Sequence, residues 1–155
     1  MHHRIVANGL DLILRPCSFT DQGFIYELMR NHMEDMFNRN TPEDWSRAKF
    51  RQGFNPDRIV ILEHEGMSIG FLDYEKRRDE LYLHCIQLSG DYQTGIGNSL
   101  LLWIEQEARK QGAKAIIGKV FLDNERIIKW LNPLGFNIFS EIPEENSYWI
   151  RKELK

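Results

Sequence analysis

The chain begins with an alternation of apolar and polar residues. Residues 10–17 (LDLILRPC) place a leucine at every second position, which is typical of a strand with one buried face. From Phe24 to Met33, apolar residues recur at helical spacing, and residues 20–23 (TDQG) before them suit a helix cap. This pattern predicts a helix that continues to about residue 36.

The polar segment 38–45 (NRNTPEDW) interrupts that helix and carries a second helix-start signal. Thr41 offers a capping hydroxyl, Pro42 suits the first turn, and the acidic residues that follow suit the positive end of a helix dipole. We therefore expect a short second helix that begins here and ends near Gly53.

Three apolar segments then predict an antiparallel meander. Residues 58–65 are rich in β-branched and other apolar side chains, and Glu65-Gly66 suits a hairpin turn into residues 67–77. Residues 79–89 (DELYLHCIQLS) follow as the next strand.

The second half alternates strands with helices. An apolar stripe over residues 97–111 predicts a helix that Gly112 ends as a C-terminal cap. The later elements are a strand, a helix and two strands, at residues 114–122, 125–132, 136–142 and 147–154. Strand–helix–strand units require some parallel pairing. We expect one domain, residues 1–155, with a mixed α/β sheet and helices on its faces.

Composition is that of a soluble globular protein. The 155 residues are 42% hydrophobic and 28% charged, with a formal net charge of −3, which argues against a dedicated nucleic-acid-binding protein. The longest apolar runs, such as 100–104, are too short to cross a membrane, and no signal peptide is evident. Cys17 and Cys85 form no metal-site spacing, so we expect buried thiols, no metal, and a cytoplasmic location.

Two closely spaced glycines, Gly95 and Gly97, precede the apolar helix in residues 90–112 (GDYQTGIGNSLLLWIEQEARKQG). The segment matches neither a phosphate-binding P-loop nor the dinucleotide fingerprint. One interpretation is a tight strand-to-helix turn. The other is an anion site, because the first N–H groups of a helix lack partners and glycines allow a phosphate close to them.

Residues 83–108 resemble the acetyl-CoA-binding motif of the GCN5-related N-acetyltransferases, in which a Gly-x-Gly turn follows a strand and opens a long helix. Residues 120–136 (VFLDNERIIKWLNPLGF) are similar to that family's strand–Asn–helix–Gly-Phe segment, with the same spacing from Asn124 to Gly135. The resemblance covers nearly the whole chain. It implies a mostly antiparallel sheet that splays at the strand ending near Leu88, and acetyl-CoA as acyl donor.

The resemblance also implies which residues bind the donor. The pyrophosphate would lie on the turn, and Asn124 would contact the pantetheine arm while capping its helix. The turn is one residue shorter than usual, and Gln93 is the preferred match to the family's Arg/Gln position, with Tyr92 as the alternative. The implied turn residues are Gln93, Thr94, Gly95, Ile96, Gly97 and Asn98.

The implied reaction is direct transfer of an acetyl group to a primary amine of a small molecule or peptide. A backbone N–H at or near Leu88 would polarise the thioester carbonyl. The amine must lose a proton before it attacks, so a base is needed. Strand alternation places Glu80, Tyr82, His84, Ile86 and Leu88 on one face. His84 is the first candidate base, directly or through water, Glu80 is the second, and Tyr82 is a further candidate. The alternative is that His84 and Tyr82 are half-buried residues of the sheet with a structural role only.

One departure from the family opens other interpretations. Many members place a tyrosine, as the acid for the departing thiolate, where this chain has Leu131. A non-catalytic acyl-CoA-binding or regulatory module of the same fold is therefore an alternative. A third alternative is a domain that has lost the cofactor and serves as an interaction scaffold or homodimer. Four aromatic residues of the last strands could form a subunit contact, although packing in the core explains them equally well: Phe136, Phe139, Tyr148 and Trp149.

In the family, the acceptor pocket is usually built around the first two helices. The corresponding side chains are Met33, Met36, Phe37, Trp45, Phe50 and Phe54. The nearby acidic residues favour a cationic amine, although helix capping explains some of them equally well: Glu34, Asp35, Glu43 and Asp44.

Overall fold

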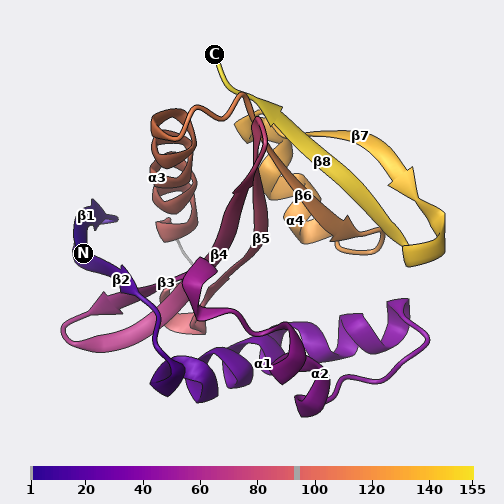
Figure 1. Cartoon of the computed structure of the whole chain (residues 1–155), viewed down its shortest axis with the longest axis horizontal. Coiled ribbons are helices and arrows are strands. Elements are labelled where there is room, and N and C mark those ends of the chain that lie inside the picture. The colour runs from indigo at the N-terminus through magenta and orange to yellow at the C-terminus, as the bar shows by residue number, and fades with distance from the viewer. Residues whose placement is uncertain (1, 93–94) are drawn as a thin grey trace.

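The computed structural model describes residues 2–92 and 95–155. Within this part of the chain, eight strands form one sheet in the order β1-β2-β3-β4-β5-β6-β8-β7 (Figure 1). The strands are β1 (His3–Ala7), β2 (Leu10–Pro16), β3 (Ile59–His64), β4 (Met67–Arg77), β5 (Glu80–Leu88), β6 (Ala115–Phe121), β7 (Asn137–Ile142) and β8 (Ser147–Glu153). The helices are α1 (Gln22–Asn40), α2 (Arg47–Gly53), α3 (Ile96–Lys110) and α4 (Glu125–Leu131).

The sheet is mixed and mostly antiparallel, as the sequence predicts. Neighbouring strands pair antiparallel except β5 and β6, which are parallel and are joined through α3. A parallel pair needs such a crossover connection. A tight turn reverses the direction of the chain and therefore joins only antiparallel strands. None of the helices described is both long and apolar enough to cross a membrane.

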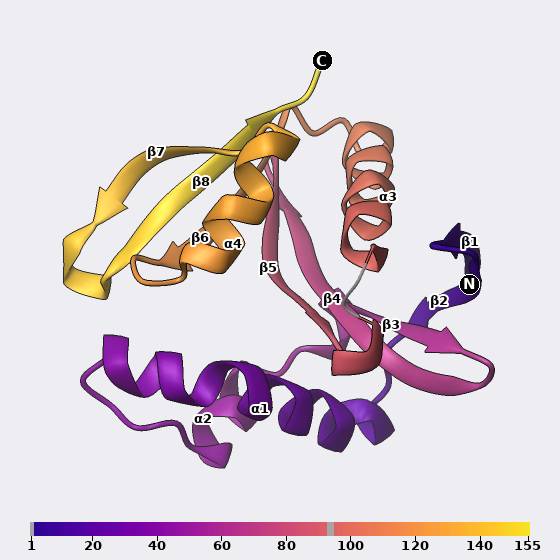
Figure 2. The same ribbon diagram turned by 180° about the vertical axis from the view of Figure 1, so that it is seen from behind.

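The sheet opens between β5 and β6. Their described pairing runs only from Glu80–Ala115 to Tyr82–Ile117, although β5 continues to Leu88 and β6 to Phe121. Figures 1 and 2 show the two strands diverging below this short paired segment. This confirms the predicted splay of the strand that ends at Leu88, and it creates room for a site inside the sheet.

Two apolar clusters pack on the sheet. The α3-side cluster also includes α4 and contains, among others, Leu72, Leu100, Ile104, Ile116 and Leu131. The α1-side cluster consists of Ile25, Leu28, Ile59, Ile61 and Phe71. Figure 2 shows α1 and α2 as a layer distinct from α3 and α4.

A β-bulge lies in the middle of β5. Asp73 pairs with Cys85 and Tyr74 pairs with Leu83, so His84 is one extra residue on β5. An extra residue of this kind interrupts the alternation of side chains along a strand.

The bulge corrects one sequence prediction. Simple alternation put five residues of β5 on one face: Glu80, Tyr82, His84, Ile86 and Leu88. Instead, Ile86 and Leu88 pack with the α3-side cluster, together with Leu81 and Leu83, whereas Cys85 packs against the α1-side cluster. The prediction is wrong beyond His84 because the bulge shifts the alternation by one residue.

The sequence also misplaces parts of the N-terminal half. It misses β1, a five-residue strand that pairs with β2 through a turn at Asn8 and Gly9, both with positive φ (52° and 79°). Thr41 does not begin the second helix. Its N–H and hydroxyl instead bond to the carbonyl of Phe37 and end α1, four residues later than predicted.

The second helix begins six residues after Thr41. Ser46 is its N-cap and its side chain accepts a hydrogen bond from the Lys49 N–H at 3.1 Å. A capping hydroxyl three residues before a free N–H stabilises a helix start, and Ser46 meets this requirement where Thr41 does not. The predicted end at Gly53 is confirmed.

Candidate active site

The opening between β5 and β6 contains a cavity with a volume of about 430 Å³, the first cavity below. Residues 83–87 of β5 and 117–121 of β6 form two of its walls. The α4 segment closes the space between these strands through Asn124, Ile127, Trp130 and Leu131. The site is therefore framed by the splay itself.

The second cavity, of about 320 Å³, lies between α1, α2 and the sheet. Four residues line both cavities: Met33, Phe37, His84 and Cys85. The two spaces are therefore neighbours, and the bulged segment of β5 is part of the wall that they share.

His84 is paired with a carboxylate. Its Nε2 lies 3.0 Å from Oε1 of Glu75 on β4. The hydrogen bond from His84 is the main reason why the pKa of Glu75 lies below its usual range, and Arg77, whose Nε donates to the same oxygen at 2.8 Å, adds to the effect. An ionised carboxylate at this position fixes the orientation of the imidazole.

The sequence analysis did not identify Glu75 as a site residue. Only the register of the β4–β5 hairpin indicates that Glu75 is near His84, because Glu75 pairs with Tyr82, two positions before His84. The bulge brings His84 within reach of Glu75, and a bulge of this kind leaves no clear pattern in one sequence.

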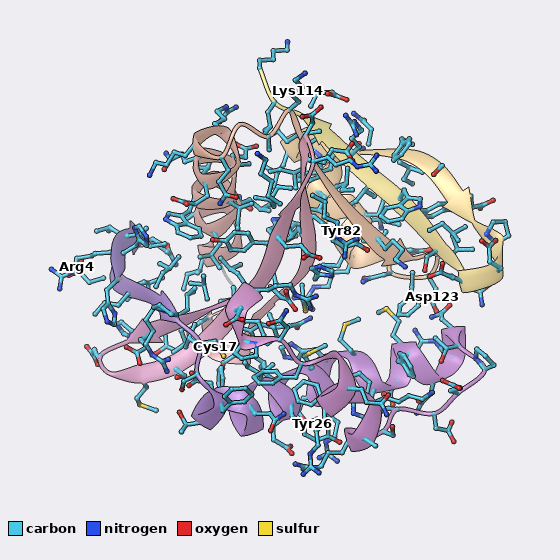
Figure 3. The ribbon with its side chains drawn as sticks, viewed as in Figure 1. Arg4, Cys17, Tyr26, Tyr82, Lys114 and Asp123 are labelled. Carbon is cyan, nitrogen blue, oxygen red and sulfur yellow. The ribbon has the colours of Figure 1, made fainter. Side chains whose placement is uncertain are left out.

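The other candidate bases lie outside the described linings of both cavities. Tyr82, labelled in Figure 3, stacks on His84 with ring centroids 4.2 Å apart, and burial raises its pKa. Glu80 forms an ion pair with Arg151 on β8. Tyr82 is thus placed to support the imidazole, and Glu80 to link β5 with β8.

Leu88 lies at the end of β5, opposite Gly70 of β4. A Cβ on Gly70 would lie 2.5 Å from the Gln87 carbonyl oxygen, so glycine allows the two strands to approach closely here. Gln87 lines the first cavity, and its Oε1 lies 2.6 Å from Nδ1 of His32 on α1. His32 therefore ties α1 to the end of β5.

Part of the predicted turn lies outside the described residues, namely Gln93 and Thr94. Gly95 is the N-cap of α3 with φ of 79°, a conformation that favours glycine, and it supplies no side-chain cap. Ile96 is buried in the α3-side cluster. A Cβ on Gly97 would lie 2.8 Å from Cζ2 of Trp130. Turn geometry and close packing therefore account for both glycines without any ligand.

The α3 start is tied to α4. Nε1 of Trp130 donates to Oδ1 of Asn98 at 2.6 Å. Asn124 caps α4, because its Oδ1 accepts from the Ile127 N–H at 3.3 Å, as the sequence predicts, and it also lines the first cavity. Leu131 is 6% exposed and presents an apolar side chain to the same cavity.

Hydrogen bonds beside the first cavity join the end of α1 to the β6–α4 loop and to the β7–β8 loop. Asp123, labelled in Figure 3, accepts hydrogen bonds from Arg39 and from the Asn40 side chain at the end of α1. The hydrogen bond from Asn40 is the main reason why the pKa of Asp123 is lowered. Asn146, between β7 and β8, donates to the Asn40 carbonyl at 3.0 Å.

Five of the six side chains expected around an acceptor line the second cavity, and Met36 is the exception: Met33, Phe37, Trp45, Phe50 and Phe54. The acidic residues expected to favour a cationic amine lie outside the described linings of both cavities: Glu34, Asp35, Glu43 and Asp44. They therefore do not form these walls themselves, although Glu43 pairs with Lys49, which lines the second cavity.

The charged side chains of the second cavity are already paired. Nε and Nη2 of Arg58 donate to the two carboxylate oxygens of Asp73 at 2.9 and 3.0 Å. Lys49, at the α2 side, forms an ion pair with Glu43. The remaining walls are mainly aromatic and aliphatic.

A mostly antiparallel sheet that parts at its parallel strand pair, with an apolar cavity in the opening, defines the acetyltransferase type of fold. The sequence profile of the Acetyltransferase (GNAT) family matches residues 25–136, and the chain belongs to this family. No curated protein matches this sequence significantly.

Solved structures of similar fold include three from microorganisms. Ard1 from Thermoplasma volcanium has a TM-score of 0.73 at 18% identity, over 93% of this chain and 98% of that one. PaiA N-acetyltransferase from Thermoplasma acidophilum, in complex with coenzyme A, has a TM-score of 0.76 at 16% identity, over 92% and 99%. A GNAT-family acetyltransferase from Listeria monocytogenes has a TM-score of 0.69 at 19% identity, over 98% and 100%.

Proposed function

We propose that the protein is a cytoplasmic N-acetyltransferase that moves an acetyl group from acetyl-CoA directly to a primary amine of a small molecule or peptide. The observation that carries this proposal is the position of His84. His84 belongs to the wall that both cavities share, and its Nε2 lies 3.0 Å from a carboxylate oxygen of Glu75. A proton acceptor between a donor site and an acceptor site is what amine acylation requires.

The first cavity suits the pantetheine arm and thioester of the donor. Its walls are the two splayed strands and α4, and Asn124 supplies an amide beside them. The positive end of the α3 dipole lies at the first residues of the helix, which begins at Ile96, and the N-cap Gly95 supplies no side-chain acceptor for their N–H groups. These features fit a diphosphate at the α3 start, and PaiA N-acetyltransferase, which has a similar fold, forms a complex with coenzyme A.

His84 would remove the proton that keeps the amine cationic. When Nε2–H donates to Glu75, Nδ1 carries the free lone pair that accepts this proton. The amine nitrogen then bonds to the thioester carbonyl carbon, the carbon–sulfur bond breaks, and the electron pair leaves on sulfur. A backbone N–H at or near Leu88 would stabilise the intermediate oxyanion. The acylated nitrogen still carries one proton too many, and it passes this proton to the thiolate, directly or through water, while the proton on His84 returns to solvent. The products are then a neutral amide and a neutral thiol.

A second candidate function rests on Leu131. Its buried side chain has no proton to give, in the position where many family members have a tyrosine. A domain that binds acyl-CoA without turning it over would have the same cavities and no need of this acid. Thiol release separates the two candidates.

The test is acetyl-CoA-dependent thiol release with a panel of amines. We expect release with at least one amine, and we expect His84→Ala to lower kcat/KM by roughly 10²–10⁴-fold, the usual contribution of a general base. His2→Ala, at an exposed position near the N-terminus, is the matched control. A rise in Tm with acetyl-CoA, but no release with any amine, would support the binding module instead.

A further inference from the structure

We propose that the acceptor is a small primary amine that carries an aromatic ring on a short alkyl chain, with the ring in the second cavity. This inference rests on the proposed function and names its substrate class. The amine would lie at His84, and the ring would extend away from the first cavity, between α1 and α2.

The walls of the second cavity provide the first argument. Its apolar lining comes from α1, α2, the loop between them and the sheet: Ile25, Met29, Met33, Phe37, Trp45, Phe50, Phe54, Ile59 and Phe71. Such a surface binds by excluding water from apolar area. A charged substrate body would lose its hydration there, and among the buried side-chain donors described only Nε1 of Trp45 lacks a partner.

The geometry of the aromatic rings favours a ring over an alkyl chain. Phe50 and Phe54 have centroids 5.7 Å apart at an interplanar angle of 32°, and Phe37 meets Trp45 edge-on, also at 5.7 Å. Aromatic pairs in offset or edge-to-face arrangements gain more than their buried area provides. A substrate ring bound among these four side chains extends an aromatic cluster that already exists.

The charges of the second cavity argue against a second charged group on the acceptor. Arg58 and Asp73 neutralise each other through two hydrogen bonds, and Lys49 is paired with Glu43. A diamine would find no unpaired carboxylate in the described lining, and an amino acid would find no unpaired cation. Breaking an existing ion pair to bind such a group leaves a charge without its partner.

The volume is consistent with a ring and a short chain. A dry apolar cavity of about 150 Å³ is sufficient for benzene in another protein. The second cavity has about twice that volume, 320 Å³, and adjoins the first one at His84 and Cys85. The acceptor is therefore assigned a short linker of two or three carbons, with the nitrogen at His84 and the ring beside Phe50.

The experiment compares kcat/KM for four amines: 2-phenylethylamine, 2-cyclohexylethylamine, butane-1,4-diamine and a tetrapeptide with a free alanine N-terminus. We expect 2-phenylethylamine to exceed the diamine and the peptide by at least about tenfold, the scale on which apolar pockets discriminate. The cyclohexyl analogue should be intermediate, because it fills the cavity without ring-to-ring contacts. A diamine or peptide that matches 2-phenylethylamine overturns the inference while leaving acetyl transfer established.

Substitutions of Phe50, in the wall of the second cavity, test the inference by comparing two amines. Phe50→Ala should lower kcat/KM for 2-phenylethylamine about tenfold and leave that for ethylamine nearly unchanged, because ethylamine does not reach Phe50. Phe50→Leu tests the same contact where the alanine variant fails to fold. Phe139→Ala is the matched control, since Phe139 is 58% exposed on the edge strand β7. Equal losses for both amines would mean that Phe50 acts on the fold alone, and would overturn the inference.

Failure of the proposed function has a different signature. If no amine supports thiol release, binding of 2-phenylethylamine is measured by its effect on Tm, in wild type and in Phe50→Leu. A rise in Tm that Phe50→Leu abolishes supports an aromatic-amine pocket in a non-catalytic protein. No rise in wild type overturns both the pocket and its substrate class.

Discussion

His84 and Glu75 are joined across the β4–β5 hairpin by a contact of 3.0 Å between Nε2 and Oε1. The contact depends on the bulge, because His84 is the residue of β5 without an opposite partner on β4. A backbone irregularity thus directs one imidazole to the wall shared by two cavities and gives it a carboxylate partner. Bulges often redirect a side chain in this way beside active sites.

We expect Glu75→Gln to lower kcat by roughly tenfold with little change in KM for either substrate. The amide still accepts a hydrogen bond from Nε2–H but no longer offsets the positive charge that forms on His84 during catalysis. The measurement is the pH profile of kcat for both proteins, which a merely structural role would leave unchanged in shape. Glu75→Asp should recover part of the loss.

The control for this prediction is Glu141→Gln, on the exposed strand β7. If Glu75→Gln retains full kcat at every pH, the carboxylate does not orient or support the base. In that case His84 acts alone or through water.

Gly97 is expected to tolerate no larger residue. Gly97→Ala would place a Cβ 2.8 Å from the Trp130 ring, so α3 or α4 must move. We expect a loss of about 1–3 kcal/mol in the free energy of unfolding, the usual cost of overpacking, and weaker binding of acetyl-CoA. Urea unfolding and a ligand-dependent Tm measure the two effects.

Gly23→Ala is the matched control for that substitution. Gly23 lies in α1 and a Cβ there meets nothing within 4 Å, so stability should be unchanged or slightly higher. Combining Gly97→Ala with Trp130→Leu should restore much of the loss. If Gly97→Ala alone is as stable as wild type, the glycine is not required for packing between α3 and α4.

Most of the fold follows from local patterns in the sequence. The apolar stripe of α3, the cap at Asn124 and the sharp turns at Gly66 and Gly112 each have a signal within a few residues, and all are confirmed. One error lies where two signals compete. Thr41 resembles a helix start, but its hydroxyl bonds back to Phe37 and ends α1 instead.

The site could be predicted only in part. His84 and the α1–α2 side chains were identified by residue type and by resemblance to a family, and the structure brings several of them into one region. Glu75 and the pairing of Arg58 with Asp73 were missed, because they depend on strand register and on one bulge. Register is a property of the assembled sheet, and a single strand does not specify it.

The Arg15–Asp21 pair predicts a loss of stability at acidic pH. Nη1 and Nη2 of Arg15 each donate to Asp21 at 2.8 Å, and these hydrogen bonds are the main reason why the pKa of Asp21 is lowered. A carboxyl group with a lower pKa in the folded state stabilises the fold fully above its unfolded pKa. That contribution is lost as the pH falls through the folded value.

Tm measured from pH 7 to pH 2 should therefore fall more steeply below about pH 4, near the ordinary pKa of aspartate, in wild type than in Asp21→Asn. The variant should be the less stable protein at pH 7, because Arg15 then lacks one carboxylate partner. Asp57→Asn, in an exposed turn, is the control. Parallel curves for wild type and Asp21→Asn would show that the pair contributes no stability linked to protonation of Asp21.

Leu131 offers a test of how the thiolate leaves. Its side chain is 6% exposed, packs with the α3-side cluster and lines the first cavity, so a tyrosine there would direct a phenol toward the donor. We expect Leu131→Tyr to raise kcat if protonation of the thiolate limits turnover. It should also cost about 1–3 kcal/mol of stability through overpacking.

Leu131→Phe is the comparison that isolates the hydroxyl, because phenylalanine adds a ring of nearly the same size without a proton to donate. A higher kcat in the tyrosine variant than in the phenylalanine variant would assign the gain to proton donation. Equal kcat values in these two variants would mean that water or the protonated His84 already serves the thiolate. The change at Leu131 would then mark a family member that does not need a dedicated acid.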